Sequence, residues 1–271
     1  MTSPRLLALA VACALLMLAS PAAWPQTTLK MSTTTSTENS GLLSALLPPF
    51  EKQENAKVHV IPVGTGKALK LGENGDVDVV FVHSRPAEDK FVEQGFGIDR
   101  RDVMYNDFVI VGPKEDSAGL KHTRTAVEAF KTLAEKRVPF VSRGDDSGTH
   151  KKEKAIWNKA GVTPRGDWYI EAGQGMAAVL QMAVQKKAYC LTDRGTFLRL
   201  EQKIPLVIVF EGDKELYNPY GVIAVNPAKH PGVNYELAKK FIDFVTGTQG
   251  QELIGSYRIN GKQLFFPCAR K

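Results

Sequence analysis

A run of hydroxyl side chains in the first polar loop is the first feature that could do chemistry. Residues 32–40 hold seven Ser and Thr, and they lie between an apolar run and a helical pattern. The capping-box spacing of Thr35 and Glu38 predicts that the helix begins near Ser36. One hydroxyl is enough to cap a helix, so two interpretations stand. The loop is either a Thr-rich turn with a good cap or a cradle of hydroxyl and N–H donors for an oxyanion.

The second polar loop, residues 62–69, brings glycines and a lysine to the start of another expected helix. The glycines let the backbone approach a ligand closely, and Thr65 adds a donor. The loop is not a P-loop, because Ile61 and Ala68 stand where that motif needs Gly and Ser or Thr. Lys67 therefore either faces a ligand or lies on the exposed first turn of the helix.

The third polar loop, residues 140–150, also leads from a strand into a helix, and it adds a full positive charge at Arg143. Ser147, Gly148 and Thr149 can present hydroxyls and N–H groups at the helix start. The loop thus supplies a third set of donors suited to an anion.

Two other interpretations of the third loop stay open. Arg143 could pair only with Asp145 or Asp146. Ser147 could be a hydrolase nucleophile, which would need an oriented His and an acid. However, His150 is too close to Ser147 to be a persuasive base, and the histidines at 59, 83, 122 and 230 form no familiar arrangement.

Two further segments carry weaker signals. Residues 171–176 precede a helix and could form a wall behind the ligand. Residues 191–196 have the character of a structural turn with an internal pair between Asp193 and Arg194.

The elements that must position these loops follow from the alternation of apolar β-rich runs with helical patterns. Pro48 and Pro49 mark the expected end of the first helix. This alternation predicts an α/β architecture with mostly parallel sheets and two domains. Strands are expected at 29–31, 58–63, 77–82, 108–111, 140–141, 188–191, 206–210 and 222–225, and helices at 41–51, 87–94, 126–137, 151–159, 176–185, 235–245 and 249–257.

The N-terminus predicts export. One positive charge precedes an apolar run at 6–19 and small residues at 20–23. This is the pattern of a signal peptide, residues 1–26, cut near 22–26. The run is short for a membrane span of about 20 residues, so an uncleaved anchor is the less favoured alternative. Cys190 and Cys268 would then lie in an export compartment where disulfides can form. The sequence leaves open whether they form a disulfide or stay as two thiols.

The composition excludes several classes of protein. The 271 residues are 43% hydrophobic and 24% charged, with a net charge of +6, which is typical of a globular chain. Lys and Arg are scattered, so nucleic-acid binding is not expected. The sequence has no metal-ligand spacing, dinucleotide fingerprint or nucleophile–base pair, so we expect no metal, no cofactor and no catalysis.

Several donor-rich loops at strand-to-helix junctions, with one arginine, suit a tetrahedral dianion. Ligands of open α/β sheets bind beyond the carboxyl ends of the strands. Each oxygen of such an anion accepts several hydrogen bonds, and charge-assisted bonds contribute about 1.5–3 kcal/mol each. Export, an α/β fold, donor-rich loops and the lack of catalytic groups are together typical of a binding protein.

Seven motifs run in order through essentially the whole exported chain. They are Thr-Thr-Thr-Ser at 33–36, Val-Gly-Thr-Gly-Lys-Ala-Leu at 63–69, Gly-Asp-Val-Asp-Val-Val at 75–80, the segment 104–113, the loop 142–150, Gly-Gln-Gly-Met at 173–176 and Leu-Thr-Asp-Arg-Gly-Thr at 191–196. Any one motif is weak, but the ordered set resembles the tungstate-binding proteins of ABC-type tungstate importers.

This resemblance implies a type II periplasmic-binding-protein fold, with the ligand in the interdomain cleft. The first α/β domain would be discontinuous, residues 27–111 and 211–271, and the second, 112–210, would be inserted in it. The resemblance also implies the ligand contacts, with Arg143 expected to matter most for affinity. The expected contacts are Thr34, Thr35, Ser36, Thr65, Gly66, Arg143, Ser147, Gly148 and Thr149.

The implied function is capture of tungstate in the periplasm and delivery to a membrane permease coupled to an ATPase. The protein is expected to be a monomer. Molybdate, which is nearly isosteric with tungstate, is the first alternative ligand, and the smaller phosphate and sulfate come next. Protonated phosphate needs an acceptor, and Asp145 or Asp146 could serve if either points into the cleft. An anion sensor with a membrane partner and a secreted hydrolase using Ser147 are the more distant alternatives.

Overall fold

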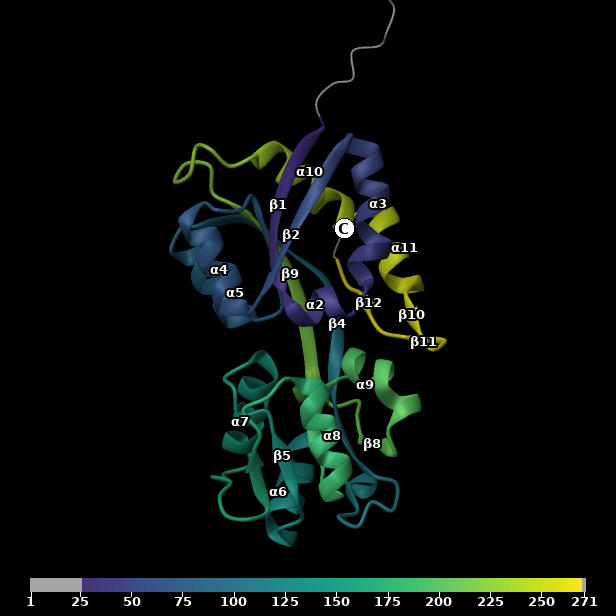
Figure 1. The fold of residues 1–271 in the computed structure, drawn as a ribbon. Helices are drawn as coiled ribbons and strands as arrows, with labels where there is room; N and C mark the ends of the chain where they lie inside the picture. The colour runs from purple at the N-terminus through teal and green to yellow at the C-terminus, as the bar shows by residue number, and fades with distance from the viewer. Residues whose placement is uncertain (1–25, 270–271) are drawn as a thin grey trace, which may run out of the picture.

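One mixed sheet of eight strands runs through both lobes of the molecule (Figure 1). The computed structural model describes residues 26–269. The predicted signal peptide therefore lies outside the described residues, apart from Gln26. No helix within residues 26–269 has both the length and the apolar character that a membrane span needs.

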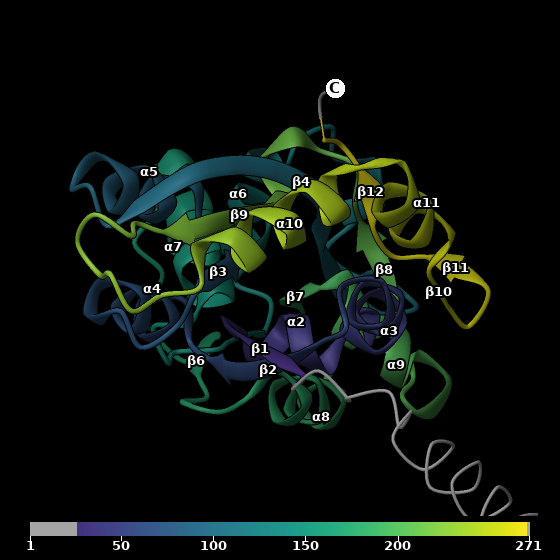
Figure 2. The same ribbon diagram turned by 90° about the horizontal axis from the view of Figure 1, so that it is seen from above.

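The upper lobe in Figure 1 is built on β1 (Thr27–Thr34), β2 (Ala56–Val63) and β3 (Val79–Val82), which are parallel. Alternate residues of a strand point to opposite faces, so Val79 and Phe81 enter one apolar core while Val80 and Val82 enter another. Figure 2 shows the two helical layers on either side of this sheet. They are α4 (Thr65–Asn74) and α5 (Arg85–Glu93) on one side, and α3 (Leu42–Glu54), α10 (Tyr235–Thr246) and α11 (Thr248–Ser256) on the other.

The lower lobe repeats this plan on a smaller scale. Its strands are β5 (Phe140–Ser142), β6 (Tyr169–Glu171), β7 (Cys190–Asp193) and β8 (Leu206–Phe210). Its helices are α6 (Ala126–Lys136), α7 (Gly148–Lys159), α8 (Met176–Lys186) and α9 (Arg194–Leu200), with short 3-10 turns at Leu120–His122, Glu201–Lys203 and Lys214–Leu216. Trp157 and Phe130 lie at the centre of its core, with ring centroids 4.4 Å apart.

Two long strands join the lobes. β4 (Gly97–Pro113) pairs with β9 (Tyr217–Val225) as far as Asp107, and from Phe108 onward it pairs with β7 and β8. β4 carries the chain down into the lower lobe and β9 carries it back (Figure 1). The C-terminal segment then forms the hairpin β10 (Arg258–Ile259) and β11 (Lys262–Gln263), and β12 (Phe266–Pro267) pairs with β4.

The expectation of mostly parallel sheets is wrong. β1, β2 and β3 are parallel, but β9 is antiparallel to both β3 and β4, and β4 is antiparallel to β7, β8 and β12. The connection between the lobes explains the difference. A chain that leaves one lobe through a strand and returns through its neighbour must run antiparallel there.

Two local predictions in the first helical region are also wrong. α3 does not end at Pro48 and Pro49 but continues to Glu54. A proline inside a helix costs about 3 kcal/mol, and burial of one apolar face offsets it: Phe50 is fully buried and packs edge-on against Phe241, with ring centroids 5.1 Å apart.

The cap of the first turn also differs from the prediction. The short helix α2 (Thr35–Asn39) begins at Thr35, and its cap is Thr34, whose side chain accepts from the Thr37 N–H. The Thr35–Glu38 spacing thus pointed to the right turn but to the wrong capping residue.

Cys190 and Cys268 do not form a disulfide in the structure. Cys190 is fully buried in β7, and burial raises the pKa of its thiol.

Candidate functional site

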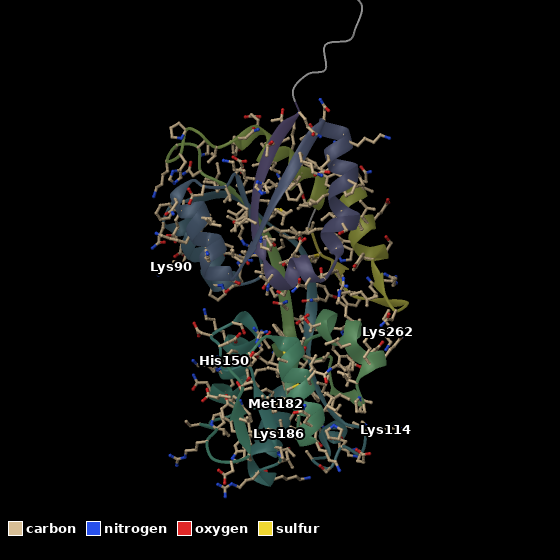
Figure 3. The ribbon with its side chains drawn as sticks, viewed as in Figure 1. Lys90, Lys114, His150, Met182, Lys186 and Lys262 are labelled. Atoms are coloured by element: carbon tan, nitrogen blue, oxygen red, sulfur yellow. The ribbon has the colours of Figure 1, made fainter. Side chains whose placement is uncertain are left out.

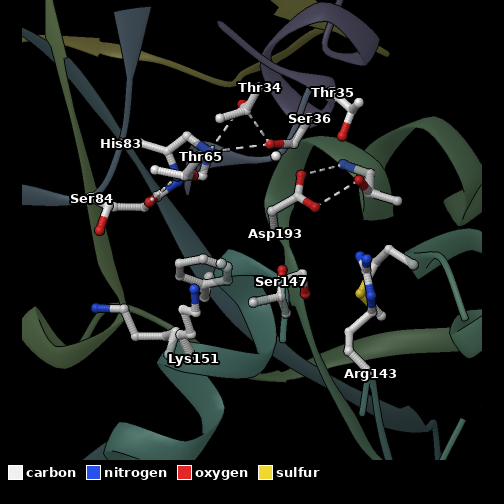
Figure 4. A pocket seen from close by; sticks show the side chains of 18 of the residues that line it. Thr34, Thr35, Ser36, Thr65, His83, Ser84, Arg143, Ser147, Lys151 and Asp193 are labelled. Carbon is white, nitrogen blue, oxygen red and sulfur yellow. Dashed lines mark hydrogen bonds between the residues drawn. The ribbon is translucent and has the colours of Figure 1, made fainter. Parts of the chain in front are cut away.

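A cleft of about 1210 Å³ lies between the lobes, and all nine residues predicted as ligand contacts line it. Thr34, Thr35, Ser36, Thr65 and Gly66 come from the upper lobe, and Arg143, Ser147, Gly148 and Thr149 come from the lower lobe. Figure 4 shows the hydroxyls of the upper lobe facing Ser147 and Arg143 across the cleft. The structure therefore brings all three polar loops together.

Helix N-termini surround the cleft. The first turns of α2, α4 and α5 line it from the upper lobe, and those of α7, α8 and α9 line it from the lower lobe. The N–H groups of a helix's first turn have no partner within the helix, and the helix dipole adds partial positive charge there. The segment 171–176, predicted to be a wall, contributes Gly175 and Met176 at the start of α8.

The first loop works both as a helix cap and as part of the cleft. Thr34 is buried, and its hydroxyl accepts from the Thr37 N–H at 3.1 Å and lies 3.0 Å from the Ser36 hydroxyl. Thr35, Ser36 and Asn39 of the same turn are more exposed than Thr34 and also line the cleft. The two interpretations of this loop are therefore compatible.

The second loop presents open backbone. Gly64 caps α4 without a side chain, and a Cβ placed on Gly64 or Gly66 would meet no other atom within 4 Å. Lys67 lies on the exposed first turn and lines the cleft as well.

In the third loop, Arg143 both pairs with Asp145 and lines the cleft. Its Nε donates to Asp145 Oδ2 at 3.1 Å. Burial tends to raise the pKa of Asp145, but hydrogen bonds from Arg143 and Ser147 outweigh it and lower that pKa. Asp145 therefore holds the guanidinium in place and offsets part of its charge.

Ser147 is the N-cap of α7, and its hydroxyl accepts from the His150 backbone N–H at 3.3 Å. The His150 ring does not serve as its base, because Nδ1 accepts from the Asp146 N–H at 3.0 Å. His150 lies in the part of the lower lobe nearer the upper lobe (Figure 3). No described contact activates Ser147 as a nucleophile.

The main residue that sequence reasoning missed is His83. It follows β3, lines the cleft, and its Nε2 lies 3.1 Å from Thr34 Oγ1 and 3.2 Å from Ser36 Oγ. On its other side Nδ1 lies 2.9 Å from Asn218 Oδ1, and the ring stacks on Tyr220. The sequence signal was its position at the end of a buried strand, where ligands of α/β sheets bind.

The cleft is also more cationic than the loops indicated. Among the residues that line it, seven are Lys or Arg and only two, Asp146 and Asp193, are acids. The added cations lie beyond the predicted loops, so the motifs did not reveal them. They are Arg85, Lys151, Lys152, Arg199 and Lys214.

The predicted pair between Asp193 and Arg194 is wrong. Asp193 caps α9 by accepting from the Thr196 N–H at 2.8 Å and hydroxyl at 2.6 Å. Arg194 instead binds Asp107 in β4, with both bonds at 2.6 Å, and pairs with Glu211. The turn thus continues into α9, and the first residue of this helix, Arg194, binds the strand β4 that joins the two lobes.

A second set of contacts joins the lobes on the side of the C-terminal hairpin. Arg199 of α9 donates to the carbonyl of Ser40, which also accepts from the Tyr257 hydroxyl at 2.7 Å. Gly41 is left-handed here (φ 79°), and a Cβ on it would lie 2.4 Å from the Arg199 guanidinium and 2.7 Å from the Tyr257 oxygen. Lys262, at the right of Figure 3, pairs with Glu201 at 2.8 Å.

Within residues 26–269, no three His, Cys, Asp or Glu side chains come together in a group that could hold a metal ion. The cleft offers hydroxyls, N–H groups and cations, which is the chemistry of an anion site.

The comparisons with known proteins agree with this chemistry. Residues 20–249 match a family model described as a PBP superfamily domain. The tungstate-binding protein TupA of Peptoclostridium acidaminophilum is 48% identical over 89% of this chain and 86% of its own length.

Two solved structures confirm the predicted fold. A tungstate ABC transporter protein from Geobacter sulfurreducens is 62% identical, with a TM-score of 0.77 over 85% of this chain and 98% of its own. The tungstate-binding protein TupA of Desulfovibrio alaskensis G20 is 45% identical, with a TM-score of 0.84 over 90% of this chain and all of its own. The α/β, type II periplasmic-binding-protein fold is confirmed.

Proposed function

Since the chain belongs to the PBP superfamily, and within it to the family of the tungstate-binding proteins, we propose that it captures tungstate and delivers it to an ABC importer. The observation that carries the proposal is a cleft in which donors far outnumber acidic groups. Helix N-termini, hydroxyls and seven Lys or Arg line it from both lobes. A fully deprotonated tetrahedral dianion needs donors on every side and no acceptor.

Two of the carboxylates at the cleft are engaged by other groups: Asp145 by Arg143, and Asp193 by the start of α9. Asp146 is 72% exposed and lies 3.4 Å from Lys151, so it could still accept the proton of a phosphate. The surplus of donors nevertheless favours a fully deprotonated anion such as tungstate, molybdate or sulfate. Among these, the names of the relatives support tungstate.

We further propose that the lobes are the two predicted domains, the lower lobe being the predicted inserted domain, residues 112–210, together with the adjoining turn at Lys214–Leu216, and that they close on the anion. The cleft of about 1210 Å³ is far larger than one oxyanion.

The remaining parts of the proposal concern location and partners. The protein is exported by its signal peptide to the periplasm, acts as a monomer, and meets a permease with its ATPase. It is not an enzyme. The test of this last point is Ser147→Ala: a hydrolase would lose all turnover, whereas a receptor would bind its anion more weakly.

The decisive experiment is isothermal titration calorimetry of the exported protein against tungstate, molybdate, sulfate and phosphate. We expect tight one-to-one binding of tungstate, unchanged by a chelator. Equal molybdate binding would make it a receptor for both oxyanions, and no binding to any of the four would overturn the proposal.

A further inference from the structure

His83 connects the buried part of the first loop to the open cleft. Its Nε2 lies within hydrogen-bond distance of both Thr34 and Ser36, whose hydroxyls are also 3.0 Å from each other. These three groups form a triangle on the upper wall of the cleft (Figure 4), and Thr34 Oγ1 also lies 2.6 Å from the Thr37 hydroxyl. Of the two hydroxyls, only Ser36 reaches the cleft well, because Thr34 is 3% exposed.

The hydrogen-bond network assigns the tautomer of His83. Asn218 Nδ2 donates to Asn106 Oδ1 at 2.7 Å, so Asn218 turns its oxygen toward the His83 ring. That oxygen can only accept, and therefore Nδ1 carries the proton. In the neutral ring, Nε2 is then an acceptor with one lone pair.

The direction of the hydrogen bonds in the triangle depends on this lone pair. With a neutral ring, Nε2 can accept the proton of the Ser36 hydroxyl, which is then not available to a ligand. With a proton on Nε2, the ring donates to the hydroxyls and cannot accept from them, so the Ser36 proton is free to point into the cleft.

On these grounds we propose that His83 takes up one proton from solvent when an oxyanion enters the cleft, and so turns the Ser36 hydroxyl toward the anion. His83 is then a positioning residue that acts through Thr34 and Ser36. The inference rests on the proposed anion binding. It adds that affinity falls as pH rises, because the charged ring and the bound anion stabilise each other.

The surroundings of His83 allow this proton to move. Burial lowers the pKa of the ring, more than the hydrogen bond to Asn218 and the charge of Asp193 raise it, which favours the neutral form in the empty cleft. Strands β4 and β9 face it with the neutral groups of Asn106, Asn218 and Tyr220. The charged groups lining the same cleft include Asp193 from β7, Asp146, Lys151 and Lys152 from the α7 region, and Arg85 from α5, which pairs with Asp89.

The test is calorimetry of the exported protein with tungstate in Tris and in HEPES, whose ionisation enthalpies differ. At about pH 8, above the ordinary histidine pKa of about 6.5, we expect uptake of up to one proton per tungstate. We also expect up to tenfold weaker binding per pH unit above neutrality. His83→Gln should abolish the uptake, and His59→Gln, the same change on the exposed face of β2, should retain it.

The outcomes of this experiment distinguish the role of His83 from the proposed function. Tungstate binding without proton uptake, or uptake that survives in His83→Gln, would overturn the role of His83 and leave the proposed function intact. Absence of tungstate binding would overturn both. Ring ¹⁵N spectra of the wild-type protein give a check that does not depend on the variant folding: Nε2 should be unprotonated without tungstate and protonated with it.

Discussion

Replacing Arg143 by Ala is the sharpest test of the anion site. Arg143 is the cation among the predicted contacts, and its side chain is only 17% exposed. Two unit charges 4 Å apart interact by about 4 kcal/mol at an effective dielectric constant of 20. This value is an upper bound per anion charge, because the Asp145 carboxylate offsets the guanidinium. The loss of one charge-assisted hydrogen bond, about 2 kcal/mol, is the better measure, and it corresponds to about 30-fold weaker tungstate binding.

The assay is calorimetric titration with tungstate, with urea unfolding as a check that the variant is folded. Arg143→Lys keeps the charge but loses the planar fork, so we expect about tenfold weaker binding. The double variant with Asp145→Asn separates the lost contact from the uncovered carboxylate, and we expect it to recover only part of the loss. Affinity of Arg143→Ala within threefold of wild type would refute the placement of Arg143 in the site.

Three other predictions concern the structure around the site. Arg194→Met leaves the Asp107 carboxylate, 12% exposed, without its bidentate partner. The free energy of unfolding, measured with urea, should therefore fall by about 2–3 kcal/mol. An unchanged midpoint of the urea transition would contradict this prediction. Gly41→Ala should lower the free energy of unfolding by more than Gly212→Ala does. Both glycines are left-handed, but of the two only Gly41 has atoms within 4 Å of an added Cβ. If both variants lost the same free energy, about 1 kcal/mol from backbone strain alone, the contact between the lobes at Gly41 would not be tight. Cys190 should resist alkylation at pH 8 until the protein is unfolded, because burial raises its pKa; peptide mapping that finds it modified in the folded protein would show the β7 core to be open.

The sequence predicted the loops of the site because their signals are local. A helix N-terminus needs a cap, and Thr34, Thr65, Arg143 and Ser147 all stand within a few residues of one. The order of strand, polar loop and helix then places these loops at the carboxyl ends of strands. Such reasoning requires no knowledge of which strands are neighbours.

His83 and the strand directions were missed for the opposite reason. His83 lies within hydrogen-bond distance of Ser36 and Thr34, 47 and 49 residues away, and of Asn218, 135 residues away. The antiparallel run of β9 against β4 depends on where the chain returns to the upper lobe. Arg194 likewise binds Asp107, 87 residues earlier, rather than the Asp193 beside it. Local spacing carries no information about such pairs.

The division of donors between the lobes explains how binding could drive closure. Thr35, Ser36 and Thr65 belong to the upper lobe, whereas Arg143 and Thr149 belong to the lower one, so neither half alone surrounds an anion. A ligand shifts a conformational equilibrium only by the difference in its affinity for the two states. Since the open state offers one half of the donors and the closed state offers both, each lower-lobe contact adds directly to that difference. The contacts of Arg199 and Lys262 join the lobes on the hairpin side, and closure would therefore narrow the cleft from the side of α4, α5 and α7.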